Sequence, residues 1–89
     1  MNILIVDDAK DMRLIMGSIV RKLGHKVVDA VDGEDAWKKL LNGKFEAVIS
    51  DWQMPRLDGL GLCKRIRDAD FSHYTYIILL TGLSGKKNI

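Results

Sequence analysis

Four short strand-like runs alternate with stretches of helical periodicity along this chain, and this alternation constrains its fold more than any other feature. The runs cover residues 3–6, 25–30, 47–50 and 76–80. Between them, apolar residues recur at steps of three and four, which is typical of amphipathic helices. Strands that alternate with helices form parallel sheets with right-handed crossovers and helices on both faces. The sequence therefore predicts an α/β fold built on a parallel sheet.

The helical stretches are bounded by residues that commonly begin or end helices. The first ends at Gly24, and the second begins at the Asp32-Gly33 turn and ends near Gly43. Ser84 could cap a fourth helix close to the last residue. We expect the apolar stripes of the three complete helices to face the core. Their members are Met12, Ile15, Met16, Ile19, Val20 and Leu23, then Trp37, Leu40 and Leu41, then Leu62, Cys63 and Ile66.

The composition argues against several classes of protein. With 14 basic and 12 acidic residues the net charge is +2, which is too balanced to indicate nucleic-acid binding. Cys63 is the only cysteine, so the chain cannot form a disulfide framework or a thiolate zinc site. The first apolar run is too short for a signal peptide or membrane span and lacks a basic start. We therefore expect a cytoplasmic domain of 89 residues that contacts neither membranes nor nucleic acid.

Acidic and hydroxyl side chains stand where the predicted strands end. Asp7 and Asp8 follow the first strand, Asp51 follows the third, and Thr81 follows the fourth. In an open parallel sheet, ligands bind outside the carboxyl ends of the strands. We therefore expect three carboxylates and one hydroxyl to converge there from separate parts of the chain.

Three carboxylates in one crevice repel each other unless a cation neutralises them. A pocket of hard oxygen ligands suits Mg²⁺, which keeps several waters and often completes its shell with phosphate oxygens. A carboxylate beside the metal can also attack phosphorus and form an aspartyl phosphate. Asp51 precedes an irregular loop, which ranks it modestly above Asp8 as the nucleophile. The competing interpretation, that the acids only cap helices, suits a single aspartate better than an adjacent pair plus a third.

Several motifs taken together resemble the receiver domain of two-component response regulators. They are VDD at residues 6–8, ISDWQMP at 49–55, LDG at 57–59 and LTG at 80–82. The resemblance implies a flavodoxin-like doubly wound parallel sheet with strand order 2-1-3-4. It also implies that residues 1–89 form a regulatory phosphoacceptor rather than an enzyme.

The resemblance assigns roles to individual residues. Asp51 would accept the phosphoryl group from a histidine kinase, and Asp8 and Asp51 would bind Mg²⁺ directly. Asp7 would act mainly through a metal-bound water, and the backbone carbonyl of Gln53 would complete the protein ligands. Thr81 would be the switch hydroxyl that moves toward the phosphate. The residues implied to shape the loop after the phosphoacceptor are Met54, Pro55 and Gly59.

The chain departs from the family pattern at its C-terminal end. The family has a fifth strand that carries a lysine, followed by a fifth helix, whereas Lys86 and Lys87 follow Thr81 too soon. The resemblance therefore implies an incomplete receiver domain that lacks roughly 25 to 35 residues, judged by ordinary element lengths. The fourth strand would then be a sheet edge open to self-association. An output domain is expected in the full-length protein.

Three other functions would also suit a parallel α/β domain with acidic residues at its strand ends. A haloacid-dehalogenase-like phosphatase would need a second acid where this chain has Gln53, which cannot transfer a proton in that way. A flavodoxin-like nucleotide or flavin binder would not place Asp7-Asp8 in its phosphate loop, because those charges repel phosphate. An interaction module that keeps the acids but is never phosphorylated stays open, and a phosphorylation assay separates it from the phosphoacceptor.

Overall fold

A computed structural model describes residues 1–53, 56–69, 71 and 73–80, and a four-stranded parallel sheet forms its centre. The strands are β1 (Asn2–Val6), β2 (Lys26–Ala30), β3 (Ala47–Asp51) and β4 (Tyr76–Leu80). Their order across the sheet is β2-β1-β3-β4, and every neighbouring pair is parallel. The predicted fold class and strand order are therefore confirmed. The second strand begins one residue later than predicted, and the third includes Asp51.

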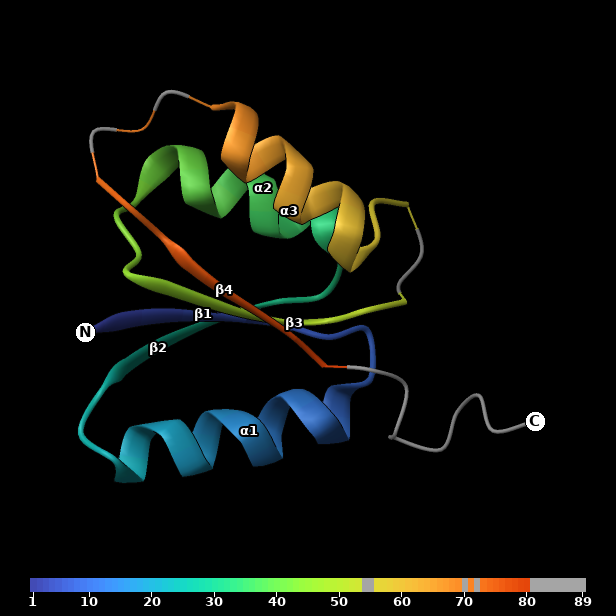
Figure 1. Ribbon diagram of the computed structural model, residues 1–89. Helices are drawn as coiled ribbons and strands as arrows, with labels where there is room; N and C mark the ends of the chain where they lie inside the picture. Colours follow the sequence, from blue (N-terminus) through green and yellow to red (C-terminus); the bar gives the residue numbers. More distant parts are fainter. Residues whose placement is uncertain (54–55, 70, 72, 81–89) are drawn as a thin grey trace.

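Helices cover both faces of the sheet, as the alternating sequence pattern requires. They are α1 (Lys10–Lys22), α2 (Gly33–Asn42) and α3 (Gly59–Asp68). In Figure 1, α1 lies on one side of the sheet, and α2 and α3 lie together on the other. This arrangement is doubly wound. In the described part of the chain, no helix is both long enough and apolar enough to cross a membrane.

The larger core lies between the sheet and the helix pair α2 and α3. Leu4 and Val48 from the two central strands are completely buried there, together with Leu62 of α3. Burial of one such side chain stabilises a fold by about 1.5 to 3 kcal/mol relative to exposure. Leu40 and Ile66 complete the inward stripes of the two helices. This core holds β1 and β3 in place, and the acidic residues lie at the ends of these two strands.

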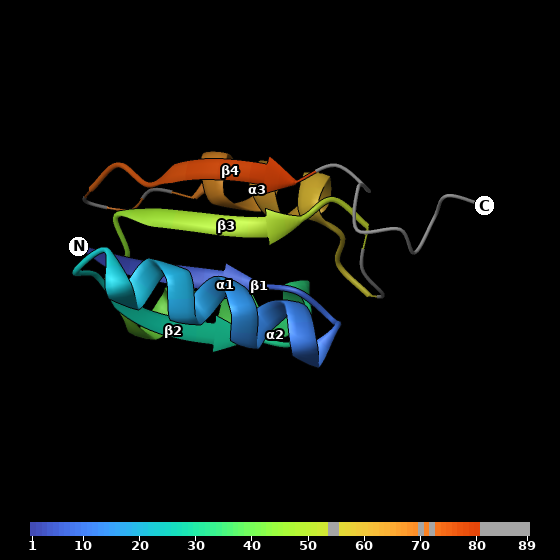
Figure 2. The same ribbon diagram turned by 90° about the horizontal axis from the view of Figure 1, so that it is seen from below.

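The opposite face of the sheet is only partly covered. Figure 2 shows α1 lying across β1 and β2, with β3 and β4 beside it. Val20 of α1 is buried with Ile3 and Ile5, but Ile15 and Ile19 are 53% and 55% exposed. The prediction that the whole α1 stripe faces the core was therefore wrong, because α1 packs over the β1–β2 half of the sheet. Other predicted core members that are not buried are Met12, Met16, Leu23, Trp37, Leu41 and Cys63.

β4 forms one edge of the described sheet. It pairs with β3 alone, from Ala47 opposite Tyr76 to Asp51 opposite Leu80. On this strand Tyr76 and Ile78 are 66% and 50% exposed. An apolar strand with one unpaired edge can pair with another chain.

Candidate functional site

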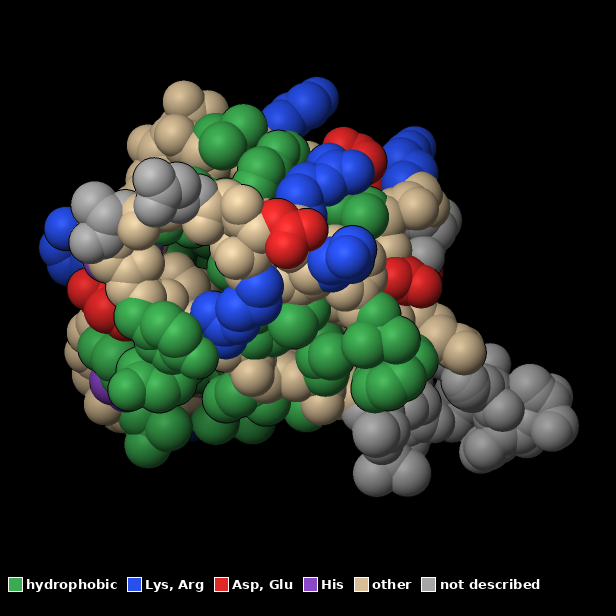
Figure 3. Space-filling model, turned by 45° about the horizontal axis from the view of Figure 1, so that its top comes forward, with side chains coloured by type: hydrophobic (Ala, Val, Ile, Leu, Met, Phe, Trp, Pro, Cys, Tyr) green, Lys and Arg blue, Asp and Glu red, His purple; other side chains and the backbone are tan. Residues whose placement is uncertain are grey.

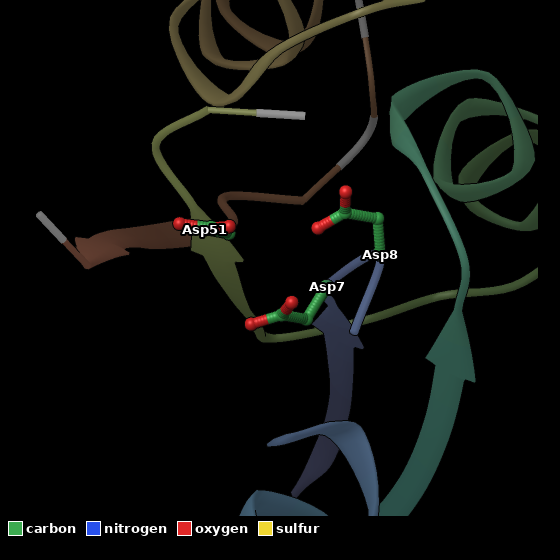
Figure 4. A group of neighbouring side chains, drawn as sticks. All are labelled: Asp7, Asp8 and Asp51. Atoms are coloured by element: carbon green, nitrogen blue, oxygen red, sulfur yellow. The ribbon is translucent and has the colours of Figure 1, made fainter. Parts of the chain in front are cut away.

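The register of the central strand pair brings the predicted acidic residues to one place. Val6 of β1 lies opposite Ser50 of β3, so Asp7 and Asp51 are the next residues at the same end of the sheet. Asp8 follows directly. Carboxylate oxygens of the three aspartates lie within 4.8 Å of one another. Figure 4 shows the three side chains gathered at the ends of β1 and β3, as expected of the three carboxylates.

The donor set of this acidic cluster fits a hard divalent cation. All three side chains offer carboxylate oxygens, which Mg²⁺ prefers over nitrogen or sulfur ligands. Asp7 and Asp51 are each only 4% exposed, while Asp8 is exposed to solvent. Buried carboxylates at this spacing repel each other strongly, and a bound cation would relieve the repulsion. The exposed Asp8 leaves one side of the cluster accessible to water and to a ligand.

The segment at Asp7 is held by two neighbouring elements, β2 and α1. The N–H of Asp7 donates a 3.2 Å hydrogen bond to the carbonyl of Ala30 at the end of β2. Its Oδ1 accepts a 2.9 Å hydrogen bond from the N–H of Ala9, which turns the chain into α1. Arg13 of α1 donates to its carbonyl oxygen at 2.9 Å and approaches Asp29 of β2 within 3.6 Å. The acidic pair therefore stands on a backbone fixed from β2 and α1 together.

The backbone at Asp51 is held by β4 and by the start of α3. The N–H of Trp52 donates a hydrogen bond to the carbonyl of Leu80, and the carbonyl of Trp52 accepts one from the N–H of Gly59. Both hydrogen bonds are 3.0 Å long. A Cβ on Gly59 would lie 2.5 Å from the Asp51 carbonyl oxygen and 3.1 Å from the Trp52 Cα. Glycine is thus required here by close backbone approach. The absence of a side chain lets α3 begin directly against the end of β3.

A comparison with known protein families identifies the chain. The family model of the response regulator receiver domain matches residues 3–89. The chain belongs to the response regulator receiver family. Accepting a phosphoryl group is the general function of this family, and its role is regulatory. Receiver domains bind Mg²⁺ at an acidic pocket and interact with histidine kinases and output domains.

Individual relatives agree with the family match. Over 91 residues the receiver domain is 36% identical to chemotaxis protein CheY1 of Helicobacter pylori, covering 100% of this chain and 73% of the relative. It is 34% identical over 88 residues to the gliding motility regulatory protein of Myxococcus xanthus, covering 99% of this chain but only 11% of that protein. The chain therefore matches a small part of the gliding motility protein and most of the chemotaxis protein.

A solved structure with similar sequence shares the fold. The response regulator protein TrrA of Thermotoga maritima, solved in complex with Mg²⁺ and BeF, superposes with a TM-score of 0.84 at 34% sequence identity. The superposition covers 97% of this chain and 73% of that protein. The described part of the chain therefore has the receiver fold.

Two further predicted site residues, Gln53 and Gly59, lie in the segment that connects β3 to α3. Gln53 is exposed two residues after Asp51, and Trp52 between them is 37% exposed. Gly59 is the first residue of α3, which Asp58 caps by accepting a 2.8 Å hydrogen bond from the N–H of Gly61. The predicted residues that lie outside the described part of the chain are Met54, Pro55, Ser84 and Thr81.

The structure also connects this loop to α2, which sequence reasoning did not anticipate. The guanidinium of Arg56 forms an ion pair with the carboxylate of Asp32, the N-cap residue of α2. A hydrogen bond from the N–H of Asp35, and then the charge of Arg56, hold the pKa of Asp32 below its usual 3.8, against the opposing effect of burial. An Asp-Gly turn and an arginine in a loop were the visible signals, but their spacing of 24 residues gave no reason to pair them.

Proposed function

We propose that this receiver domain accepts a phosphoryl group on Asp51 in a Mg²⁺-dependent reaction. The observation that carries the proposal is the meeting of three carboxylates from β1 and β3 within 4.8 Å at the carboxyl end of the sheet. Asp8 and Asp51 would bind the cation directly, Asp7 would act through a metal-bound water, and the backbone carbonyl of Gln53 would complete the protein ligands. Thr81 would contact the phosphoryl group as the switch hydroxyl.

The proposed transfer is a displacement at phosphorus. A carboxylate oxygen of Asp51 attacks the phosphorus of a kinase phosphohistidine, and the phosphorus–nitrogen bond breaks. Its electron pair returns to the imidazole nitrogen, and an acyl phosphate remains on Asp51. Bound Mg²⁺ would neutralise charge on the transferring group. The chain itself supplies orientation, because Asp51 is 4% exposed and its backbone is fixed by α3 and β4.

The shape of the loop after Asp51 belongs to the same proposal. Met54 and Pro55 would shape the loop, and the Gln53 carbonyl would face the cation. Gly59 would allow the loop to return to the end of β3, which is supported by the close approach of the Asp51 carbonyl to this residue. The loop would thus bring a neutral oxygen ligand to a site otherwise made of carboxylates.

We propose that residues 1–89 act in the cytoplasm as a receiver module with a histidine kinase and an output domain as its partners, and not as an enzyme with a separate substrate. Contact with nucleic acid or membranes is not part of the proposal. On the face over α2 and α3, basic and acidic side chains are mixed with hydrophobic ones in Figure 3. A surface of mixed charge does not create the extended positive potential that binding of a nucleic acid would require.

We further propose that the 89-residue chain can associate with a second copy through the edge of β4. Tyr76 and Ile78 on this strand are at least half exposed, and Ile15 and Ile19 of α1 add apolar surface on the partly covered face. Pairing two such edges would satisfy backbone groups and bury apolar surface at the same time.

Phosphorylation assays test the assignment of Asp51. The wild-type chain in its full-length protein should take up an acid-stable, hydroxylamine-labile label from a kinase or a small phosphodonor. Asp51→Asn should abolish the label because it removes the nucleophilic oxygen. Asp58→Asn is the matched control: it alters an aspartate in the same loop, and asparagine caps helices as well as aspartate does. A label that persists in Asp51→Asn would show the assignment to be wrong.

A further inference from the structure

The loop between β3 and α3 is closed at its base. The carbonyl of Trp52 accepts a 3.0 Å hydrogen bond from the N–H of Gly59, which joins the two ends of the loop. The Asp51 carbonyl packs directly against Gly59, so the base cannot shift relative to the phosphoacceptor. Gln53 stands between this base and the tip of the loop. The far end of the loop, Arg56 and Leu57, is called the tip below, and its position is one of the factors that set where the Gln53 carbonyl lies.

The tip is held by the first turn of α2. Asp32 is 4% exposed; one of its oxygens accepts from the Asp35 N–H at 2.8 Å, and the other pairs with the Arg56 guanidinium. A second contact lies beside this pair. A Cβ on Gly33 would lie only 2.7 Å from the Leu57 carbonyl carbon, so the backbones of α2 and the loop are in close contact. Two independent contacts thus dock the tip on α2.

Arg56 adopts an unfavourable backbone conformation to make this contact. Its φ is +66°, in the left-handed region that non-glycine residues seldom occupy. Such a conformation persists only where surrounding contacts enforce it, and it is concentrated at functional sites. Asparagine or glycine would fit the backbone better but could not reach Asp32 with a positive charge. The ion pair with Asp32 is thus what arginine provides at this position and asparagine or glycine does not.

We propose that Asp32 and Arg56 are a positioning pair for the loop that follows the phosphoacceptor. The pair fixes the tip against α2 and thereby sets where the Gln53 carbonyl lies relative to the Asp51 carboxylate. This inference rests on the proposed function, because it assumes that the loop and the acidic cluster bind one cation together. Neither residue touches the cation or the phosphoryl group.

Two single variants separate positioning from simple electrostatics. Asp32→Asn removes a negative charge but keeps an oxygen for the α2 cap, and Arg56→Met removes a positive charge. An electrostatic effect on Mg²⁺ affinity would have opposite signs in the two variants. Loss of positioning would weaken Mg²⁺ binding in both, and we expect about a tenfold rise in Kd, the lower end of what supporting residues contribute. Arg56→Lys should recover most of the affinity because it keeps the charge.

The measurement is a titration of Mg²⁺ against Trp52 fluorescence in a Trp37→Phe background, so that the loop tryptophan reports alone. Lys64→Met and Asp68→Asn are matched controls, since they remove an exposed 4.0 Å ion pair on α3 that includes neither Asp32 nor Arg56. Their Kd should equal that of the parent. Without Mg²⁺, the emission of Trp52 should also shift in Asp32→Asn and Arg56→Met, but not in the controls.

The possible outcomes distinguish this inference from the function on which it rests. If the parent binds no Mg²⁺, both are wrong. If the parent binds Mg²⁺ and the two variants bind it equally well, the positioning role alone is wrong. Opposite shifts in Kd would also overturn it, because they would show that the two charges act at a distance. Parallel weakening with rescue by Arg56→Lys would support it.

Discussion

Replacing Gly59 by alanine tests whether close backbone approach at the start of α3 determines the geometry of the phosphoacceptor. The added Cβ would lie 2.5 Å from the Asp51 carbonyl oxygen, 3.0 Å from Leu79 Cδ2 and 3.1 Å from the Trp52 Cα. Ordinary contact begins at 3.4 Å. Two of the three neighbours are backbone atoms, which cannot rotate away. The carbonyl of Asp51 or the first turn of α3 must therefore move by close to an ångström.

The expected magnitude follows from two opposing effects. Alanine is favoured over glycine within a helix by about 1 kcal/mol, although less at its first residue. Forcing an extra methyl group into a packed site costs about 1 to 3 kcal/mol. Because the collision involves backbone, we expect the upper part of that range and a net loss of about 1 to 2 kcal/mol in the free energy of unfolding. The displaced Asp51 should also bind Mg²⁺ more weakly.

Urea denaturation in the absence of Mg²⁺ measures the first effect, and Mg²⁺ titration measures the second. Gly61→Ala is the matched control in the same helix. Its Cβ would meet chiefly the end of the Leu57 side chain, 2.7 Å from Cδ1, which can rotate away. This variant should be neutral or slightly stabilising because only the helix preference remains. If Gly59→Ala were as stable as Gly61→Ala, the reasoning about the loop base would be refuted.

Three further predictions concern stability, metal binding and association. The pKa of Asp32 is held below 3.8, so its ionised form contributes stability that is present above that pH and is lost as pH falls through the folded pKa. The wild type should therefore exceed Asp32→Asn in free energy of unfolding by the largest amount near neutral pH. This difference should disappear in strong acid, where Asp32 is protonated. A difference that does not change with pH would contradict the prediction. Mg²⁺ should change the emission of Trp52, and the change should vanish in the double variant of Asp8→Asn with Asp51→Asn; an unchanged response there would remove the metal site. On a chain of 89 residues verified by mass spectrometry, light scattering should show self-association, or denaturation should show marginal stability. Ile78→Lys should suppress the association. A stable, cooperatively unfolding wild-type monomer would contradict the prediction.

Much of the fold and the cluster could be predicted because both depend on regular geometry. Apolar runs of strand length between helical periodicities leave few topologies open. The residues after parallel strands then necessarily share one edge of the sheet, so Asp7 and Asp51 had to meet once β1 and β3 were neighbours. That neighbour relation came from the family resemblance, since periodicity alone does not order the strands.

Features that depend on which surfaces pack together could not be predicted. The α1 stripe is apolar around Ile15 and Ile19, but their burial depends on how far the helix extends across the sheet. The contact between Asp32 and Arg56 joins segments with no shared periodicity, and it forms because the loop tip folds back over α2. The family resemblance marked Gly59 as a loop-shaping residue, but the backbone distance that requires glycine there is visible only in the structure.

The acidic cluster joins residues that stand nearly half the chain apart, since Asp8 and Asp51 come from strands separated by β2 and two helices. No local segment can therefore bind the cation before the β1–β3 pairing has formed, and closing so long a loop is a slow event in folding. Cation binding should consequently favour the native chain over its unfolded ensemble by mass action. Bound cation would then also slow the separation of β1 from β3. It would thereby slow the unfolding of the helices that pack on these two strands.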